Sequence, residues 1–419
     1  MKHFEIRNGM RVEVSTLRGV LMRNYLYWGA ISFVLGAAVA CSPVRFSRDE
    51  SLQCQGTGSA NCVVTPDGLE TFGPFKFKVG GGKVDILFVD DNSASMSFEQ
   101  SKLAERFSNF IQNLDARQVD YRIAITTTDI QTANNPPRAV NKEGALQNGR
   151  LVTFDDGSKF LTPSQANRVN LFNRAITRKE TQDCESFIRN YIAQYGPASR
   201  NTTDYNNKYF QNCPSTDERG VYAPNLTILN NYDSFIRSDA NLAVILISDE
   251  DARSELYAQQ HPDFPLETLD TPASFASNMA SKFPGKIWNF HSIIVKDASC
   301  RQQQSQQILD SAGQSVVQGS YGNLYAKFNL ELKDEAGRPR GIMGDICASD
   351  YTSQLGQITT NISDRVEEIA LKCKDPVSLS ITPTSIQWSR NGNIVKLAQP
   401  LAVGTELTVT YKCNPKGVL

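Results

Sequence analysis

The chain has 419 residues, of which 40% are hydrophobic and 21% are charged. Its 43 Lys and Arg residues nearly balance its 44 Asp and Glu residues, so the formal net charge is −1. A chain of this length and apolar content can bury one large core or two modest cores. It contains no basic stripe and no run of lysines, so nucleic acid is not expected as a partner.

Residues 1–40 have the pattern of a targeting segment and are set apart from the fold. Arg18 and Arg23 precede an apolar run from Tyr25 to Ala40, which ends in Ala38-Val39-Ala40-Cys41. Small residues directly before a Cys, behind a hydrophobic run, resemble a bacterial lipoprotein signal. The resemblance implies that Cys41 is the mature N-terminus and carries lipid. A plain secretory signal or a single membrane anchor is the alternative, although a comfortable span needs roughly 20 apolar residues.

Two further residues bear on this signal. Met22 would start a signal of ordinary length, and residues 1–21 would then be an upstream extension. Ser42 follows Cys41, so no Asp stands at the position that marks lipoproteins for the inner membrane. By that sorting rule, the resemblance implies a lipid-anchored protein of the outer membrane in a Gram-negative cell. The chain would face either the periplasm or the cell surface.

The eight cysteines that remain after Cys41 indicate disulfide bonds, because an even number in an exported chain is typical of them. The connectivity does not follow from the sequence. We expect sequential pairs: Cys54–Cys62, Cys184–Cys213, Cys300–Cys347 and Cys373–Cys413. Structural zinc is not expected, because no Cys-x-x-Cys occurs and the mature chain has His only at positions 261 and 291.

Residues 41–82 are rich in Ser, Gly and Thr, which predicts a lipidated tether that contains the Cys54–Cys62 loop. An edge strand is expected at residues 75–79. Gly80-Gly81-Gly82-Lys83 precedes a strand, whereas the glycines of a phosphate-binding loop follow one, so a flexible turn is expected there.

Strands and helices alternate over residues 83–372. Continuous apolar runs predict buried strands at residues 84–89, 121–127, 241–248 and 286–295. Apolar residues at three- and four-residue spacing predict helices at residues 97–116 and near 350–373. This alternation predicts an α/β domain, a doubly wound, mostly parallel sheet flanked by helices, similar to a Rossmann fold. Polar insertions at residues 129–168 and 196–225 are either ligand-facing loops or solvated decoration.

The pattern changes after Cys373. Short β-type segments at residues 377–381, 385–389, 394–398 and 407–411 are separated by turn residues. They predict a small all-β unit over residues 373–419. A unit of this size has a small core, so a Cys373–Cys413 disulfide would help to stabilise it.

Two acidic motifs follow predicted strands. Asp91-Asn92-Ser93-Ala94-Ser95 offers one carboxylate and two hydroxyls at alternate positions, which suits a hard divalent cation. Ser248-Asp249-Glu250-Asp251 follows another central strand, and the carboxyl ends of parallel strands meet at one edge of a sheet. The alternatives are local: the two serines of the first motif could cap the next helix, and the acids could bond their own turns.

Together the motifs resemble those of von Willebrand factor type A (vWA) domains, and the Ser-Asp-Glu-Asp run resembles their bacterial secreted branch. That family carries a metal-ion-dependent adhesion site. The resemblance implies metal ligation by Asp91, Ser93, Ser95 and Asp249. It also implies a Thr from an intervening loop, for which Thr181 is the candidate and Thr177 the runner-up. The family's usual Gly neighbours are absent here. Asp90 is expected to face away, because side chains alternate along a strand.

Mg²⁺ is the expected ion because the ligands are hard oxygens and few in number, with Mn²⁺ or Ca²⁺ as alternatives. Two carboxylates leave a dication under-neutralised, so an Asp or Glu of a protein or cell-surface ligand would complete its shell. The resemblance therefore implies non-catalytic adhesion or assembly. The alternative is a structural subunit of an envelope complex with a vestigial or stabilising metal site. The common catalytic motifs are absent, so neither an enzyme nor a small-molecule substrate is expected.

Overall fold

The computed structural model describes residues 62–78, 82–130, 147–214, 217–253, 265–284, 286–308, 319–334, 337–366, 368–373, 375–398 and 405–415. The chain divides into two units, residues 1–48 and 49–419, and every described residue belongs to the second unit. Cys41, Cys54 and His261 lie outside the described residues. Within the described ranges, none of the helices combines the length and apolar composition needed to span a membrane.

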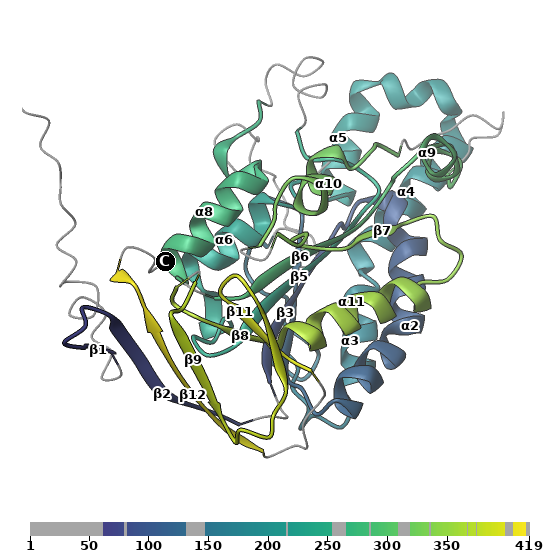
Figure 1. Ribbon diagram of the computed structural model, residues 1–419. Coiled ribbons are helices and arrows are strands. Elements are labelled where there is room, and N and C mark those ends of the chain that lie inside the picture. Colours follow the sequence, from purple (N-terminus) through teal and green to yellow (C-terminus); the bar gives the residue numbers. More distant parts are fainter. Residues whose placement is uncertain are drawn as a thin grey trace, which may run out of the picture. The chain divides into compact units, whose positions relative to one another are not determined.

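A five-stranded parallel sheet forms the centre of the second unit (Figure 1). Its strand order is β4-β3-β5-β6-β7, and every neighbouring pair runs parallel. The strands are β3 (Lys83–Asp90), β4 (Asp120–Thr127), β5 (Asn241–Ser248), β6 (Trp288–Ile294) and β7 (Met343–Asp345). The four strands that the apolar runs predicted are all present. Their side chains are buried on both faces, which accounts for runs without polar alternation.

Helices cover both faces of this sheet, so the expected α/β fold class is confirmed (Figure 1). One face carries α2 (Ser97–Ala116), α3 (Arg168–Ile176) and α11 (Thr352–Val366). The other face carries α6 (Tyr222–Asn230), α8 (Pro272–Lys282) and α10 (Asn323–Leu330). Further helices are α4 (Lys179–Tyr195), α5 (Thr203–Asn212) and α9 (Ala298–Ser305), with short 3-10 turns η1 (Ala94–Met96), η3 (Pro197–Asn201), η4 (Tyr232–Ser234) and η5 (Thr268–Asp270).

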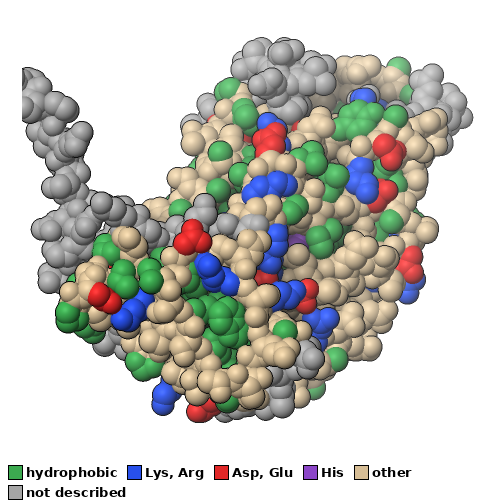
Figure 2. Space-filling model, viewed as in Figure 1, with side chains coloured by type: hydrophobic (Ala, Val, Ile, Leu, Met, Phe, Trp, Pro, Cys, Tyr) green, Lys and Arg blue, Asp and Glu red, His purple; other side chains and the backbone are tan. Residues whose placement is uncertain are grey.

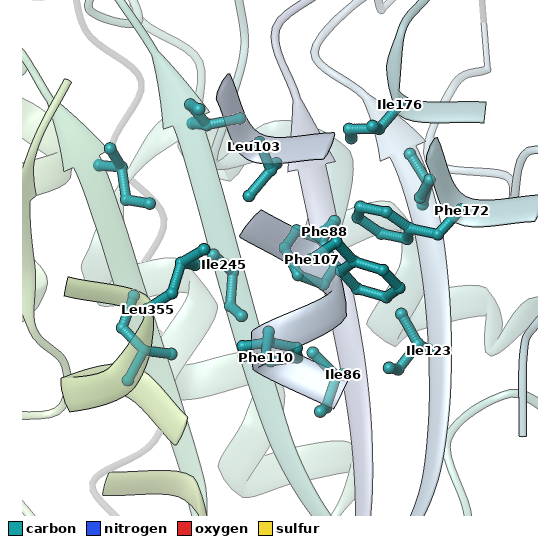
Figure 3. Packing of buried hydrophobic residues seen from close by; sticks show 14 of the residues in the cluster. Ile86, Phe88, Leu103, Phe107, Phe110, Ile123, Phe172, Ile176, Ile245 and Leu355 are labelled. Atoms are coloured by element: carbon teal, nitrogen blue, oxygen red, sulfur yellow. The ribbon is translucent and has the colours of Figure 1, made fainter. Parts of the chain in front are cut away.

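Alternate side chains of β3 enter the two hydrophobic cores. Phe88 packs into the core beneath α2 and α3, where its ring meets that of Phe172 edge-on at 4.9 Å (Figure 3). Phe107 of α2 stacks on the same Phe172 ring at 3.4 Å. Leu87 and Val89 point to the opposite core. Burial on both sides fixes β3 rigidly, and the first acidic motif follows directly after it.

Three disulfides join the expected partners: Cys184–Cys213, Cys300–Cys347 and Cys373–Cys413. The first links α4 to the end of α5 and so closes a helical hairpin. The second links α9 to the segment after β7. The fourth expected pair includes Cys54, which lies outside the described residues.

Two small antiparallel sheets form the additional β unit. The first has the order β1-β2-β12-β9, and the second has the order β10-β11-β8. The strands are β1 (Cys62–Val64), β2 (Glu70–Lys78), β8 (Glu368–Ala370), β9 (Ser378–Thr382), β10 (Trp388–Asn391), β11 (Ile394–Leu397) and β12 (Glu406–Cys413). Both sheets contribute to one hydrophobic cluster, which includes Phe72, Ile381, Val395 and Tyr411.

Three expectations differ from the structure. The last helix ends at Val366, and Ile369 lies in β8, where it pairs with Val395. The strand expected at residues 385–389 lies at Trp388–Asn391. The strand expected at an edge near residues 75–79 begins at Glu70 and lies between β1 and β12. The first and third differences arise from pairing with strands distant in the sequence, which local patterns do not report, whereas β10 pairs with β11, the next strand along the chain.

Candidate metal-binding site

The two acidic motifs meet at the carboxyl edge of the parallel sheet. They follow β3 and β5, which are direct neighbours. The backbone amide of Asp91 donates to the carbonyl of Ile247 at 3.1 Å. The Ser248 hydroxyl donates to Oδ2 of Asp91 at 2.6 Å. The two acidic motifs therefore lie next to each other, as their positions after strands of one parallel sheet predicted.

The serine hydroxyls and Asp249 form a chain of close oxygens beside Asp91. The Ser93 amide donates to Oδ1 of Asp91 at 2.9 Å, which folds the loop around that carboxylate. The Ser93 and Ser95 hydroxyl oxygens lie 3.1 Å apart, and Ser95 Oγ donates to Oδ1 of Asp249 at 3.1 Å. Two oxygens on adjacent vertices of a Mg²⁺ octahedron lie about 3 Å apart. The spacing of these oxygens therefore suits a shared cation.

Thr181 lies behind this loop. Its hydroxyl donates to the carbonyl of Asn92 at 2.8 Å and accepts from Nε2 of Gln100 at 3.2 Å. The structure thus places Thr181 against the motif's backbone and does not bring its hydroxyl to Ser93 or Ser95. Thr177 lies further off, where its hydroxyl donates to the carbonyl of Asn173 at the end of α3.

Gln100 of α2 organises the back of the site. Its Nε2 donates to the Asp91 carbonyl and to Oδ2 of Asp90, both at 3.1 Å, as well as to Thr181. Its Oε1 accepts from the backbone amide of Arg178 at 3.2 Å. Asp90 therefore points toward α2, whereas the Asp91 carboxylate points toward Ser248, as alternation along the strand predicts.

Glu218 lies near Asp91, although no motif in the sequence indicated it. It lies in the polar insertion between α5 and α6, where a β-bridge with Asp129 and a bond from the Arg219 amide to the Thr128 carbonyl fix the backbone. Burial raises the pKa of its carboxyl group well above the ordinary value, and the charge of Asp91 raises that pKa further. Its Oε2 accepts from the Thr128 hydroxyl. The only sequence signal was an acidic residue within a polar insertion.

Three buried acids, Asp91, Glu218 and Asp249, lie in this region together with the half-buried Glu250, and their charges influence one another. Burial raises the pKa of all four carboxyl groups, that of Glu250 to about 8. The neighbouring charge of Asp91 further raises the pKa of Glu218 and of Asp249. Buried carboxylates at such close range need either protons or a cation to offset their charge.

No basic side chain supplies that cation in the described part of the chain. Arg219 and Arg253 are the nearest arginines in sequence, but both are committed elsewhere. Arg219 pairs with Asp270 at 2.7 Å, and Arg253 pairs with Asp217.

Two carboxylate oxygens of the site have no hydrogen-bond donor opposite them. These are Oδ2 of Asp249 and Oε1 of Glu218, and both are buried. A buried acceptor without a partner costs free energy, about 1–3 kcal/mol. A divalent cation would satisfy both atoms, so the residues present fit a hard metal ion.

Among the described residues, one group of three or more His, Cys, Asp or Glu side chains has its ligand atoms close together, and it is not the group of acids at the sheet edge. Cys300, Asp345 and Cys347 offer ligand atoms within 4.8 Å of one another. The two sulfurs, however, are bonded to each other in a disulfide. This cluster is therefore a structural link and offers no thiolate for a metal.

Comparisons with known proteins give distant likenesses. No protein-family model and no curated protein matches the chain. Among solved structures, the chain is similar to the pilus adhesin SpaC from Lactobacillus rhamnosus GG, at 12% identity and a TM-score of 0.33, over 82% of this chain and 41% of that one. It is also similar to a von Willebrand factor type A protein from Catenulispora acidiphila, at 10% identity and a TM-score of 0.29, over 82% and 60% of the two chains.

A third similar structure is proximal thread matrix protein 1 from the mussel byssus, at 9% identity and a TM-score of 0.29, over 71% of this chain and 51% of that one. The chain thus spans about two fifths of the adhesin's length and about half of the byssus protein's length. Likenesses of this size do not indicate a function. The function of this chain is therefore inferred from its own residues and topology.

Proposed function

We propose that this chain is a vWA-type binding protein whose site at Asp91, Ser93, Ser95 and Asp249 holds a divalent cation, Mg²⁺ first. The cation would bind a carboxylate of a protein or cell-surface partner, in adhesion or assembly and without catalysis. One observation carries the proposal: the Asp-x-Ser-x-Ser loop and the loop that bears Asp249 meet at the carboxyl edge of a parallel sheet, where the Ser95 hydroxyl contacts Asp249 and the Ser248 hydroxyl contacts Asp91. Thr181 supports the loop from behind.

The hydroxyl groups of Ser93 and Ser95 favour a bound cation over protons that the carboxyl groups share. A proton-sharing acid cluster does not require Ser93 and Ser95 to lie beside it, whereas a small hard ion needs several neutral oxygens. Two carboxylates and two hydroxyls of the chain, with a partner's carboxylate, would leave few positions for water around the ion. Mn²⁺ could replace Mg²⁺, because both accept octahedral oxygen shells.

The charge pattern of the surface is consistent with a protein or surface partner. Figure 2 shows basic and acidic side chains interspersed on one face, and its coloured residues form no continuous basic patch there. Phe98, in the first turn of α2, is 57% exposed next to the Asp-x-Ser-x-Ser loop. An exposed aromatic ring beside a metal site would give a partner an apolar contact.

The proposed location is the outer membrane, through lipid on Cys41. Support comes from the apolar run that ends at Cys41 and from three disulfides, which are typical of exported proteins. Metabolic labelling with a palmitate analogue should mark the wild-type chain and not the Cys41→Ser variant. Labelling of both chains, or of neither, would remove the lipid anchor from the proposal.

Metal binding is tested by thermal unfolding with Mg²⁺, with Mn²⁺ and with chelator. A ligand at 100 times its Kd stabilises the folded state by about 2.7 kcal/mol, so a shift in Tm is expected for wild type. Asp91→Asn should abolish that shift. Asp155→Asn is the matched control, because Asp155 is an exposed acid paired with Arg174. Equal Tm with metal and with chelator in wild type would remove the metal site.

Partner binding is tested by pull-down from envelope extracts at millimolar Mg²⁺. Wild type and Asp155→Asn should retain the same partners, whereas Asp91→Asn or chelator should release them. Partners that stay bound after both treatments would support the alternative function, a structural subunit whose metal only stabilises the fold.

A further inference from the structure

We propose that Cys300, Cys347 and Asp345 form a zinc site when the disulfide between the two cysteines is reduced. In the part of the chain that the structure describes, the ligand atoms of these three side chains lie within 4.8 Å of one another. While the disulfide stands, neither sulfur can bind a metal. The site would therefore form only in the reduced chain. It shares no residue with the proposed site at Asp91.

The Cys300–Cys347 disulfide is the most accessible of the three that the structure describes. The four cysteines of the other two bonds are at most 4% exposed. Cys300 is likewise buried, whereas Cys347 is half-buried. External thiols reduce accessible disulfides more readily than buried ones. Reduction is therefore expected at this bond first, with attack on the sulfur of Cys347.

The position of Cys300 favours its release as a thiolate. It is the third residue of α9, and the positive end of a helix dipole stabilises a thiolate. A thiolate of an external dithiol would attack Sγ of Cys347, and Cys300 would leave. The second thiol of the reductant would then close the reductant's own disulfide and release Cys347. Two electrons and two protons pass from the dithiol to the two cysteines, and Zn²⁺ displaces both protons on binding.

Asp345 supplies an oxygen ligand beside the two sulfurs. Its Oδ1 accepts from the Cys347 amide at 2.9 Å, and its own amide donates to Oε1 of Gln354 at 2.8 Å, which fixes this residue at the end of β7. Zn–S distances of about 2.3 Å and Zn–O distances of about 2.1 Å put the ligand atoms of a tetrahedral site about 3.6–3.8 Å apart. Small side-chain rotations after reduction would bring the three ligand atoms to this spacing.

Gln304 of α9 lies beside the sulfur of Cys347. Its Nε2 is 3.6 Å from Cys347 Sγ and donates to Oε1 of the buried Glu99 at 3.0 Å. A donor beside a thiolate stabilises the negative charge, and contacts of this kind support the ligands of metal sites. Thiolates are soft ligands, so they favour Zn²⁺ over Mg²⁺ or Ca²⁺. Three protein ligands leave the fourth tetrahedral position for water or another molecule.

Zinc binding by the full chain, before and after mild reduction with a water-soluble phosphine, tests the inference. Alkylation and mass spectrometry should show that Cys300 and Cys347 are reduced while the other two described disulfides remain. In competition with a chromophoric chelator, the reduced chain should bind Zn²⁺ at least about 100-fold more tightly than the oxidised chain, because the oxidised chain offers no thiolate. Co²⁺ in place of Zn²⁺ should give the near-ultraviolet charge-transfer absorption of thiolate ligands.

Two variants test the ligands themselves. Asp345→Asn removes the charged oxygen and should weaken Zn²⁺ binding by the reduced chain at least about 10-fold, while the thiolate absorption of the Co²⁺ form remains. The double variant Cys300→Ser, Cys347→Ser should lose both. If the double variant does not fold, Asp345→Asn still decides, because it retains the disulfide. Asp239→Asn is the control, since Asp239 is an acid with a side chain that is 60% exposed, and it should change neither quantity.

Three results would overturn the inference. The first is equal Zn²⁺ affinity of the oxidised and reduced chains. The second is equal Zn²⁺ affinity of reduced wild type and reduced Asp345→Asn. The third is reduction of another described disulfide before Cys300–Cys347. None of these measurements depends on Mg²⁺ at Asp91, so the inference and the proposed function can fail separately.

Discussion

The hydroxyl of Ser248 donates a 2.6 Å hydrogen bond to Oδ2 of Asp91, and both side chains are buried. This bond joins the loops after two neighbouring strands, β3 and β5. It also fixes the orientation of the Asp91 carboxylate, since Oδ1 accepts from the Ser93 amide. The geometry of the site therefore depends on a residue that is not itself proposed as a metal ligand.

Ser248→Ala removes the donor and leaves a buried carboxylate oxygen without a hydrogen bond. The free energy of unfolding should fall by about 1–3 kcal/mol in the presence of chelator. Urea titration followed by circular dichroism measures this change. Ser164→Ala, at an exposed position, should stay within about 0.5 kcal/mol of wild type. Equal stability of both variants would show that the bond is unimportant.

Two half-buried acids, Glu250 and Asp251, predict an unusual dependence of stability on pH. Burial raises the pKa of Glu250 to about 8 and that of Asp251 to about 7, from ordinary values of 4.5 and 3.8. Between the ordinary and the raised values, the folded chain binds more protons than the unfolded chain. The free energy of unfolding should therefore fall as the pH rises from about 4 to about 8. The stabilisation is fully present below the ordinary pKa.

Thermal unfolding in chelator at pH 5 and pH 8 measures this effect, and the Tm should be higher at pH 5. Glu250→Gln should reduce the difference, because it removes one of the titrating groups. Mg²⁺ should reduce it too, because the cation offsets the charge that protons otherwise neutralise. A Tm that rises from pH 5 to pH 8 in chelator would contradict the prediction.

Arg219 is fully buried and pairs with Asp270 through two hydrogen bonds. Arg219→Met leaves the Asp270 carboxylate buried without its cation, which should cost about 3–5 kcal/mol of stability. Asp270→Asn in the same chain should recover part of that loss, and a double-mutant cycle by urea titration measures the coupling. Arg174→Ala breaks an exposed pair and should cost less than about 1 kcal/mol.

The Cys184–Cys213 disulfide closes the α4–α5 hairpin across 29 residues of sequence. Replacing both cysteines by Ala should lower stability by about 3–4 kcal/mol, because the unfolded chain regains the freedom of that loop. Guanidinium titration measures the loss. Ala94, which precedes Ser95, packs in the same hydrophobic cluster as this disulfide. The double variant should therefore also weaken Mg²⁺ binding.

Much of the fold was predictable because local pattern and burial agree. The apolar run of β3 and the three- and four-residue spacing of α2 define those elements directly, and helix α2 has the predicted bounds. Asp91 and Asp249 were predictable for the same reason, since each follows such a strand. The prediction of these elements did not depend on contacts with residues distant in the sequence.

Glu218 and β2 were not predictable on those grounds. Glu218 reaches the site because its backbone bridges to Asp129 at the end of β4. Strand β2 is stabilised by β12, at the other end of the chain. Thr181 donates its hydroxyl to the carbonyl of Asn92, a contact that its position in the sequence did not indicate, and its role as a metal ligand stays a prediction. Tertiary pairing decides all three positions.

The role of β2 gives a last prediction, since the Ser- and Gly-rich composition indicated a tether. Phe72 is 4% exposed, and its ring stacks on that of Tyr411 at 5.2 Å. Phe72→Ala should therefore destabilise the β unit by about 3–5 kcal/mol, as the loss of a buried aromatic ring does. Val63→Ala, at a side chain that is 62% exposed, should have little effect. Hydrogen exchange of the β12 amides shows whether β2 is a structural strand or part of a tether. If β2 is a structural strand, these amides should exchange faster in Phe72→Ala. If it belongs to a tether, its side chains contribute nothing to the fold and the exchange should not change.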